Sequence, residues 1–446
     1  MASSSIVHVK EAVVIAPAEP TPSRILALSA LDSQLFLRFT IEYLLVYRTR
    51  PGTDPCATVA RIKNALARAL VPYYPLAGRV RARTDGGLEV VCRAQGALFI
   101  EAVSDHNNTT TISELERAPR HVTQWRKLLS FHVDDVLIGA PPLVVQLTWL
   151  RDGSATLGIA FNHCVCDGIG SAEFLNLFAQ LSTRQLNEFK PKPVWDRHLL
   201  NPPGNRPRSN SLSHHPEFTR VPDLCGFVSR FNNERLTPTS ITFDKRSLNE
   251  LKKLALSTSR LSESTYTSFE VLAAHVWSSW AMSLNLPSNQ ILKLLFSINV
   301  RNRVKPSLPS GFYGNAFVLG CAQTSVRELT EKGLGYATML VKRAKDRVDN
   351  EFVRSVVDSV IESSSSSSRQ MTCPDSVGVL ILTQWSRLGL ERVDLGMGKP
   401  VHVGPICCDR YCLFLPVFNQ TDAVKVMVAV PTSAVDKYQH LIRSVC

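Results

Sequence analysis

The residues best suited to chemistry form one short segment, His163-Cys164-Val165-Cys166-Asp167-Gly168. The imidazole of histidine titrates near pH 6.5, so at neutral pH it is largely uncharged and can accept a proton. A carboxylate four residues later could orient the ring, or could instead hold the loop by pairing with a base elsewhere. Gly168 permits a backbone turn that other residues resist. The segment indicates a general base on a loop, although a histidine beside apolar residues is also commonly a buried core group.

Cysteine is the other reactive residue type, with 11 copies along the chain. Two of them flank Val165, and three more lie close together at positions 407, 408 and 412. None of these spacings matches a common zinc site, so we expect no metal. No secretory leader is recognisable, and no run approaches the roughly 18 apolar residues that span a bilayer. We therefore expect reduced thiols in a cytoplasmic protein with no membrane span.

The elements around the histidine can be predicted from hydrophobic patterning. Residues 143–149 and 155–161 form the clearest pair of strands, joined by the turn Arg151-Asp152-Gly153. Helical spacing returns at residues 171–181, where Ser171 is a suitable N-cap. His163 is therefore expected at the end of a core strand and just before an amphipathic helix.

The rest of the chain divides into two mixed halves. We expect an N-terminal domain over residues 1–200, a crossover linker rich in Pro, Asn, Ser and Arg over 201–240, and a C-terminal domain over 241–446. Strands and helices mix without regular βαβ alternation, which favours two α/β halves of α+β-like character over one doubly wound sheet. In the second half we expect helices over 245–256, 268–284, 326–348 and 433–444, with strands over 292–300, 377–382 and 424–430.

Composition bounds the possible partners. The 446 residues are 44% hydrophobic and 20% charged, which is typical of a globular chain with a sizeable core. The net charge of +12 favours anionic ligands. The basic residues occur as scattered doublets and triplets, and neither zinc-finger spacing nor an aromatic–basic RNA signature is present. We expect no nucleic-acid partner.

Taken together, several blocks resemble the BAHD family of plant acyl-CoA-dependent acyltransferases. Residues 163–168 match the family's His-x-x-x-Asp-Gly signature, and nearly the whole chain, from about residue 9 to 442, carries further blocks in the family's order. These are Leu28 to Asp32, Tyr74 to Arg79, Ser268 to Trp277, Asn299 to Arg301, Phe312 to Asn315 and Asp394 to Pro400.

The resemblance implies two similar-sized mixed-sheet domains of chloramphenicol-acetyltransferase-like type, with an active-site channel at their interface. His163 would be the general base, acting directly on the acceptor with no enzyme nucleophile. Asp167 would pair with Arg301 and, with Gly168, shape the loop. The family is mostly monomeric and holds no permanent cofactor, so acyl-CoA would be a co-substrate.

The resemblance also places Thr267 and Ser268 near coenzyme A, and Thr383 and Trp385 in the acceptor channel. Ser268 could instead be a helix N-cap and Trp385 ordinary core. Asp394 begins a structural block in which Leu395 and Met397 stand where the family has aromatic residues. We expect activity to survive this departure and the packing of the second domain to be affected.

The expected reaction is transfer of an acyl group from a CoA thioester to an acceptor hydroxyl. An aromatic acyl group, hydroxycinnamoyl or benzoyl, is favoured because the stretch from His163 to Asn176 is similar to members that transfer hydroxycinnamoyl groups to aliphatic alcohols. Two alternatives stay open: amide formation on an amine acceptor, and a non-catalytic relative that only binds. Intact His163, Asp167 and Arg301 argue against the second alternative.

Overall fold

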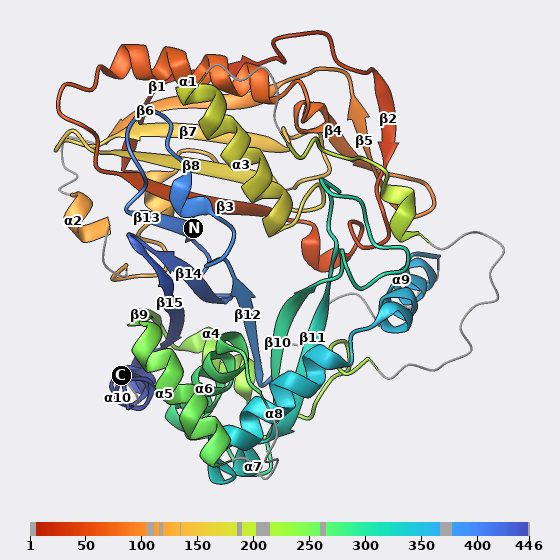
Figure 1. The fold of residues 1–446 in the computed structure, drawn as a ribbon, viewed down its shortest axis with the longest axis vertical. Coiled ribbons are helices and arrows are strands. Elements are labelled where there is room, and N and C mark those ends of the chain that lie inside the picture. The colour runs from red at the N-terminus through yellow and green to blue at the C-terminus, as the bar shows by residue number, and fades with distance from the viewer. Residues whose placement is uncertain are drawn as a thin grey trace.

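The computed structural model describes residues 6–104, 111–115, 119–133, 135–184, 190–201, 215–258, 265–365 and 377–444. Two mixed sheets organise this part of the chain, one built mainly by each half (Figure 1). In spatial order, the first consists of β1 (Val7–Ile15), β6 (Ala97–Ser104), β7 (Leu143–Trp149), β8 (Ala155–Asn162), β3 (Thr40–Tyr47) and β13 (His402–Pro405). Only β6 and β7 run parallel in it.

The second sheet has the same number of strands in the described residues. Its spatial order is β11 (Phe317–Ser325), β10 (Ile291–Asn299), β12 (Val379–Gln384), β14 (Cys412–Val417), β15 (Gln420–Pro431) and β9 (Leu236–Phe243). A small sheet beside the first contains β2 (Arg24–Ala27), β5 (Leu88–Cys92) and β4 (Arg79–Ala82). The expected α/β architecture of two mixed-sheet halves is confirmed.

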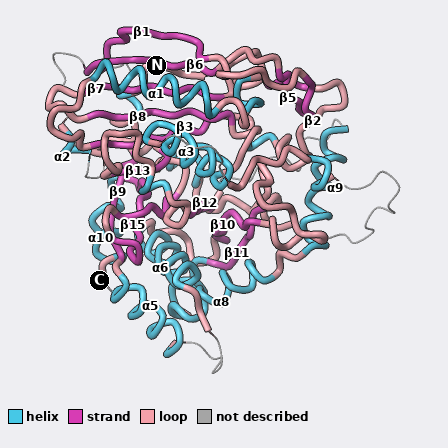
Figure 2. The backbone as a smooth tube through the Cα atoms, turned by 45° about the horizontal axis from the view of Figure 1, so that its top comes forward, coloured by secondary structure: helices cyan, strands magenta, loops and turns pink. Residues whose placement is uncertain are grey.

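Helices cover both sheets, as the tube in Figure 2 shows. Those of the first half are α1 (Pro55–Ala69), the short α2 (Ile112–Leu115) and α3 (Gly168–Thr183). Those of the second half are α4 (Phe227–Asn233), α5 (Lys245–Ser257), α6 (Ser268–Ser283), α7 (Val326–Glu331), α8 (Gly333–Asp346), α9 (Asn350–Ser365) and α10 (Val435–Ile442). Among the described helices, none combines the length and the apolar character that crossing a bilayer requires.

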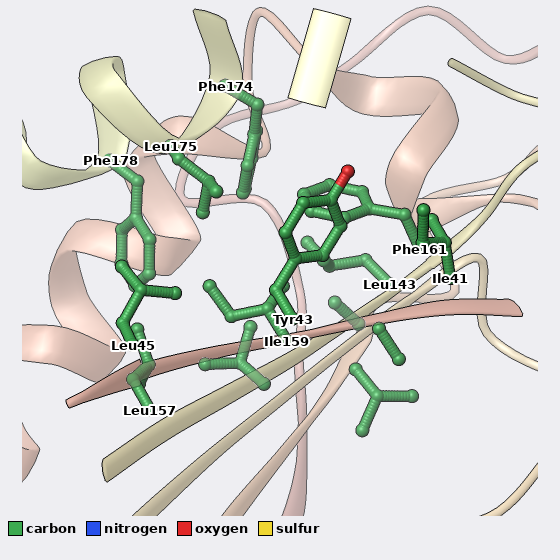
Figure 3. Close-up of a cluster of buried hydrophobic side chains, with 14 of the residues drawn as sticks. Ile41, Tyr43, Leu45, Leu143, Leu157, Ile159, Phe161, Phe174, Leu175 and Phe178 are labelled. Carbon is green, nitrogen blue, oxygen red and sulfur yellow. The ribbon is translucent and has the colours of Figure 1, made fainter. Parts of the chain in front are cut away.

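Helix α3 packs directly on the first sheet (Figure 3). Ile41, Tyr43 and Leu45 alternate along β3 and point toward α3, as expected for a strand whose side chains change face at every residue. Phe174 and Phe178 of α3 meet them, and the Phe174 and Phe161 rings pack edge to face. This apolar layer fixes the strand end from which the His163 loop leaves.

Two local expectations need correction. The N-cap of α3 is Asp167 and not Ser171, because the Asp167 side chain accepts a hydrogen bond from the Gly170 N–H. The single helix expected over 326–348 is two helices, α7 and α8, which break at Gly333. That residue has φ +77°, a left-handed conformation that glycine adopts without strain and that interrupts a helix.

The C-terminal segment does not stay within the second half. Strand β13 pairs antiparallel with β3, so residues 402–405 complete the first sheet rather than the second. The sheet topology thus differs from a division of the chain at residue 240. The expected linker differs too: α4 and the start of β9 lie within 201–240, and residues 202–214 lie outside the described residues.

Candidate active site

His163 is the first residue beyond β8, at the edge of the first sheet that faces the second half. Its backbone N–H donates to the carbonyl oxygen of Phe39, 3.0 Å away. Asn162 closes the turn, because its side-chain oxygen accepts from the Cys164 N–H and its carbonyl accepts from the Val165 N–H, both at 3.0 Å. Hydrogen bonds at the strand end therefore fix the backbone of His163.

The imidazole of His163 lies between rings from both halves. Its centroid is 5.3 Å from that of Phe39 and 6.2 Å from that of Phe317, on β11. Nδ1 is buried and has no hydrogen-bond partner among the described residues, while the residue keeps some accessible surface. Burial lowers the pKa of His163, an effect that the nearby Asp167 and Asn315 oppose. The neutral ring can therefore act as a base at physiological pH.

Asp167 is paired with Arg301 across the two halves, as the resemblance implies. Arg301 Nη1 lies 2.8 Å from Oδ2, and Nη2 lies 3.1 Å from Oδ1. The carboxylate also accepts from the backbone N–H groups of Gly170 and Ala316. Burial alone would raise the pKa of Asp167, but the guanidinium and these hydrogen bonds outweigh it and lower the pKa. All these bonds favour the charged form of Asp167, which indicates a structural role and not proton transfer.

A second buried ion pair supports the same loop, and the sequence analysis missed it. Asp32 is fully buried, and Arg197 Nη1 donates to its Oδ2 at 2.5 Å. Asn315 donates to Asp32 Oδ1 and, at 2.8 Å, to the carbonyl of His163. Arg197 Nη2 donates to the Val165 carbonyl at 2.8 Å. The first three residues of the signature loop are thus tied, through the carbonyls of His163 and Val165, to one polar network that contains residues from both halves.

Glycines let this network approach the backbone. Gly314 has φ +153°, and a Cβ there would lie 2.3 Å from Arg197 Nη1.

Gly168 packs against Trp385, and a Cβ on it would lie 3.3 Å from the indole ring. Trp385 is buried, with its ring centroid 5.0 Å from that of Tyr43. The expected channel residue Trp385 therefore lies beside the start of α3, close to the signature loop.

The other expected channel and coenzyme positions lie in the second half. Thr383 is on β12 and pairs with Leu413 of β14. Thr267 is the N-cap of α6 and forms a capping box with Glu270, which gives its hydroxyl a structural role. The N-cap that was expected at Ser268 is thus one residue earlier, and Ser268 instead lines a cavity.

Asp394 organises its own segment. Its Oδ1 accepts from the N–H groups of Gly396 and Gly398, at 2.7 and 2.9 Å, and Oδ2 pairs with Arg50 at 3.3 Å. Leu395 and Met397 are fully buried in the hydrophobic core of the first half. The departure from the family's aromatic residues therefore concerns the first core, which corrects the expectation that the second domain's packing is affected.

The thiols next to His163 are poor nucleophiles. Burial raises the pKa of Cys164 to about 12 and that of Cys166 to about 12, so both stay protonated at neutral pH. In the described part of the chain, no group of three or more His, Cys, Asp or Glu side chains is arranged to hold a metal ion.

Two of the cavities formed by the described residues bear on the substrates, although His163 lines neither. One, of about 440 Å³, is lined by Phe39 and its neighbours on β3 together with residues 122–133 and 406–411. The other, of about 320 Å³, is lined by α5, the start of α6, residues 384–387 and the β14–β15 hairpin. Lys245, Lys252 and Arg387 line the second cavity together with Asp422, whose Oδ2 lies 3.4 Å from Lys245 Nζ, so the lining is basic overall.

A neutral histidine held between two mixed sheets suits removal of a proton from an acceptor that attacks an activated acyl group. This fold and site are those expected of an acyltransferase. The sequence model of the Transferase family matches residues 5–443, and the chain belongs to that family, the BAHD acyltransferases.

Known proteins agree with this assignment. The chain is 33% identical to omega-hydroxypalmitate O-feruloyl transferase of Arabidopsis thaliana, covering 97% of this chain and 92% of that protein. It is 31% identical to 3'-N-debenzoyl-2'-deoxytaxol N-benzoyltransferase of Taxus canadensis, over 96% and 94% of the two chains.

Among solved structures, vinorine synthase superposes with a TM-score of 0.71 at 19% identity, over 97% of this chain and 96% of that chain. TRI101 of F. sporotrichioides, solved with coenzyme A and T-2, superposes with a TM-score of 0.75 at 16% identity, over 94% and 97%. These two structures share the fold of this chain.

Proposed function

We propose that this acyltransferase moves an aromatic acyl group, hydroxycinnamoyl or benzoyl, from coenzyme A to an acceptor hydroxyl, with His163 as the general base. The observation that carries the proposal is the His163 imidazole, which is kept neutral by burial and lies between rings of both halves. An alcohol does not ionise at neutral pH, so attack on the thioester requires a base positioned to remove the proton as the new bond forms.

The reaction proceeds by direct transfer. The acceptor oxygen attacks the thioester carbonyl carbon, and its proton passes to His163. The C–S bond of the resulting tetrahedral intermediate then breaks, and the proton goes from His163 to the departing sulfur, which releases free coenzyme A and the ester. The raised pKa values of the thiols at 164 and 166 support a path without an acyl-cysteine intermediate.

The basic cavity is the proposed site for the phosphates of coenzyme A. Ser268 lines it beside Lys245, Lys252 and Arg387, and phosphates are recognised by such cations and hydroxyl groups. Thr267 lies at the start of the same helix, α6, where backbone N–H groups also favour anions. Coenzyme A in the TRI101 structure supports a CoA site in this fold.

The acceptor is proposed to reach His163 from the other cavity, whose wall includes Phe39. Thr383 and Trp385 are proposed to contact substrate between the two cavities. The indole N–H of Trp385 supports this, because it is buried and has no hydrogen-bond partner among the described residues. A buried donor of this kind is available to a bound ligand.

A hydroxyl acceptor and an aromatic acyl group are both supported by the feruloyl transferase relative, whose name states an O-acylated product. A second candidate function is amide formation on an amine, favoured by the similarity to an N-benzoyltransferase. The same base could serve, because an ammonium must lose a proton before its nitrogen attacks.

The test is release of free thiol by the purified protein with a panel of acyl-CoAs and with pooled alcohols and amines, followed by mass analysis of the products. The proposal predicts an aromatic ester whose formation requires His163 and survives His8→Ala, a control histidine on the exposed edge strand β1. An amide as the main product would favour the second candidate. Absence of any product despite saturable acyl-CoA binding would overturn both.

A further inference from the structure

The cavity beside Phe39 contains a carboxylate that the proposed chemistry does not use. Its lining includes Glu42 of β3 and Arg126, which lies in a short 3-10 turn before β7. Glu42 Oε2 and Arg126 Nε are 3.0 Å apart. Because Phe39 also packs against the imidazole, this ion pair lies in the same cavity wall as a direct neighbour of His163.

Glu42 occupies an unusual position for a charged residue. It lies in a strand whose other residues are mostly apolar and buried, between Ile41 and Tyr43, which point toward α3. Alternation along the strand turns Glu42 to the opposite face, and only 14% of its side chain is exposed. Burial raises the pKa of Glu42 to about 7, against the attraction of Arg126. Such a placement costs stability unless the carboxylate gains a further partner.

Arg126, the ion-pair partner of Glu42, is shared with other acceptors. Arg126 also donates to the carbonyls of Leu129 and Phe131, and its Nη2 lies 3.1 Å from His132 Nδ1. Its guanidinium is therefore held by the backbone around it. Among the described residues, Glu42 Oε1 has no hydrogen-bond partner, so one strong acceptor on the cavity wall is available to a ligand.

The charges around the cavity restrict what that ligand can be. Arg126 and Arg410 line it with positive charge, and Glu42 and Asp409 line it with negative charge. A cationic group would be repelled by the two arginines, and an anionic group would be repelled by the two carboxylates. A neutral hydroxyl can donate a hydrogen bond to Glu42 without either conflict.

We propose that Glu42 accepts a hydrogen bond from a second hydroxyl group of the acceptor, so that the preferred acceptors are neutral molecules with at least two hydroxyls. One hydroxyl is acylated at His163, and the other is held by Glu42 on the cavity wall. This inference rests on the proposed function, because it assigns the acceptor to the cavity beside Phe39. Glu42 is then a positioning residue that selects the acceptor and takes no part in the proton transfer.

The experiment compares straight-chain alkane-1-ols with α,ω-alkanediols of the same length, over a series of lengths, using an acyl-CoA that supports turnover. The wild-type protein is expected to show a higher kcat/KM for the diol at one or more lengths. Glu42→Leu should lower the kcat/KM of that diol, relative to its matched alcohol, about 10- to 100-fold, as expected for loss of a hydrogen bond to a charged group. Glu42→Gln, which keeps an acceptor oxygen, should retain part of the preference.

Glu89→Leu is the matched control. Glu89 also pairs with an arginine, Arg81, and its side chain is 15% exposed, but it lies in the small sheet away from the cavity. The control should keep the wild-type ratio of diol to alcohol. Circular dichroism and thermal unfolding check that each variant is folded. If Glu42→Leu does not fold, Glu42→Gln provides the test.

The inference is overturned if the wild type does not prefer any diol, or if both Glu42 variants keep the preference. It is also overturned if the variants change selectivity only among acyl-CoAs that differ by a ring hydroxyl, because the cavity would then hold the acyl group. Failure of the proposed function gives a different result, since neither alcohols nor diols would then be acylated by the wild type.

Discussion

Arg301 holds both carboxylate oxygens of Asp167, at 2.8 and 3.1 Å. Asp167 follows the last strand before the signature loop, and Arg301 follows β10 of the second sheet. The same guanidinium donates to the carbonyls of Phe312 and Gly314, each at 3.2 Å. The pair therefore joins the two halves four residues from His163, and it can be tested separately from the chemistry.

Replacing Asp167 with Asn should destabilise the protein by about 3–5 kcal/mol, because the largely buried Arg301 guanidinium would lose its compensating charge. Urea unfolding of the purified variant measures the loss. The double variant Asp167→Asn, Arg301→Leu should recover part of it, because no uncompensated charge is then buried. A single variant as stable as the wild type would show that the pair does not stabilise the contact between the halves.

The Met397→Ala variant tests whether the unusual segment after Asp394 is structural. Met397 is fully buried in the first core, so truncation should cost about 2–5 kcal/mol through lost apolar contact and a residual cavity. At temperatures where the variant is folded, kcat and KM should stay near the wild-type values. A loss of kcat in a fully folded variant would instead assign this segment to the active site.

Lys252→Gln tests the basic cavity. If this lysine attracts a phosphate of coenzyme A, the KM for acyl-CoA should rise about two- to fivefold, the range expected for a partly exposed ion pair. The KM of the variant should also depend less on salt concentration. Lys253→Gln is the matched control, because the neighbouring Lys253 is exposed, pairs with Glu250 and does not line this cavity. Equal KM values in the two variants would contradict the assignment.

The pH profile follows from the burial of His163. Only the neutral imidazole can accept a proton, and burial lowers its pKa below the ordinary 6.5. The titration of His163 by itself should therefore leave activity constant above that pH and lower it as the pH falls through the shifted pKa. Burial raises the pKa of Glu173 to about 7, near Arg301 and Asp167, so a second titration is expected there. Burial also raises the pKa of Glu42 to about 7, so the test uses the double variant Glu42→Gln, Glu173→Gln. In that variant the titration near 7 should disappear and the lower one persist, and an acid limb centred above 6.5 would exclude His163.

Local pattern predicts much of this fold. The hairpin of β7 and β8, and helices α5 and α6, lie within one or two residues of their expected positions, because periodicity and turn chemistry are encoded in neighbouring residues. The break between α7 and α8 could not be predicted from the sequence in the same way, because an isolated glycine is tolerated inside many helices.

Contacts between residues far apart in the sequence could not be predicted from local patterns. Nothing near Val403 indicates that it lies opposite Leu45 in the first sheet. The partners of Asp32 are similarly distant, with Arg197 165 positions and Asn315 283 positions away in sequence. Patterns of apolar residues do not specify such contacts, and Arg197 carries no local sign that it is buried. The Asp167–Arg301 pair could be anticipated only through the family resemblance.

The most direct test of the central claim is the turnover of His163→Ala with saturating acyl-CoA and acceptor. Loss of a general base should reduce kcat about 10²- to 10⁴-fold, with the fold and the affinity for acyl-CoA retained. That result would establish His163 as the group on which transfer depends. A folded His163→Ala variant that forms product at the wild-type rate would contradict the account.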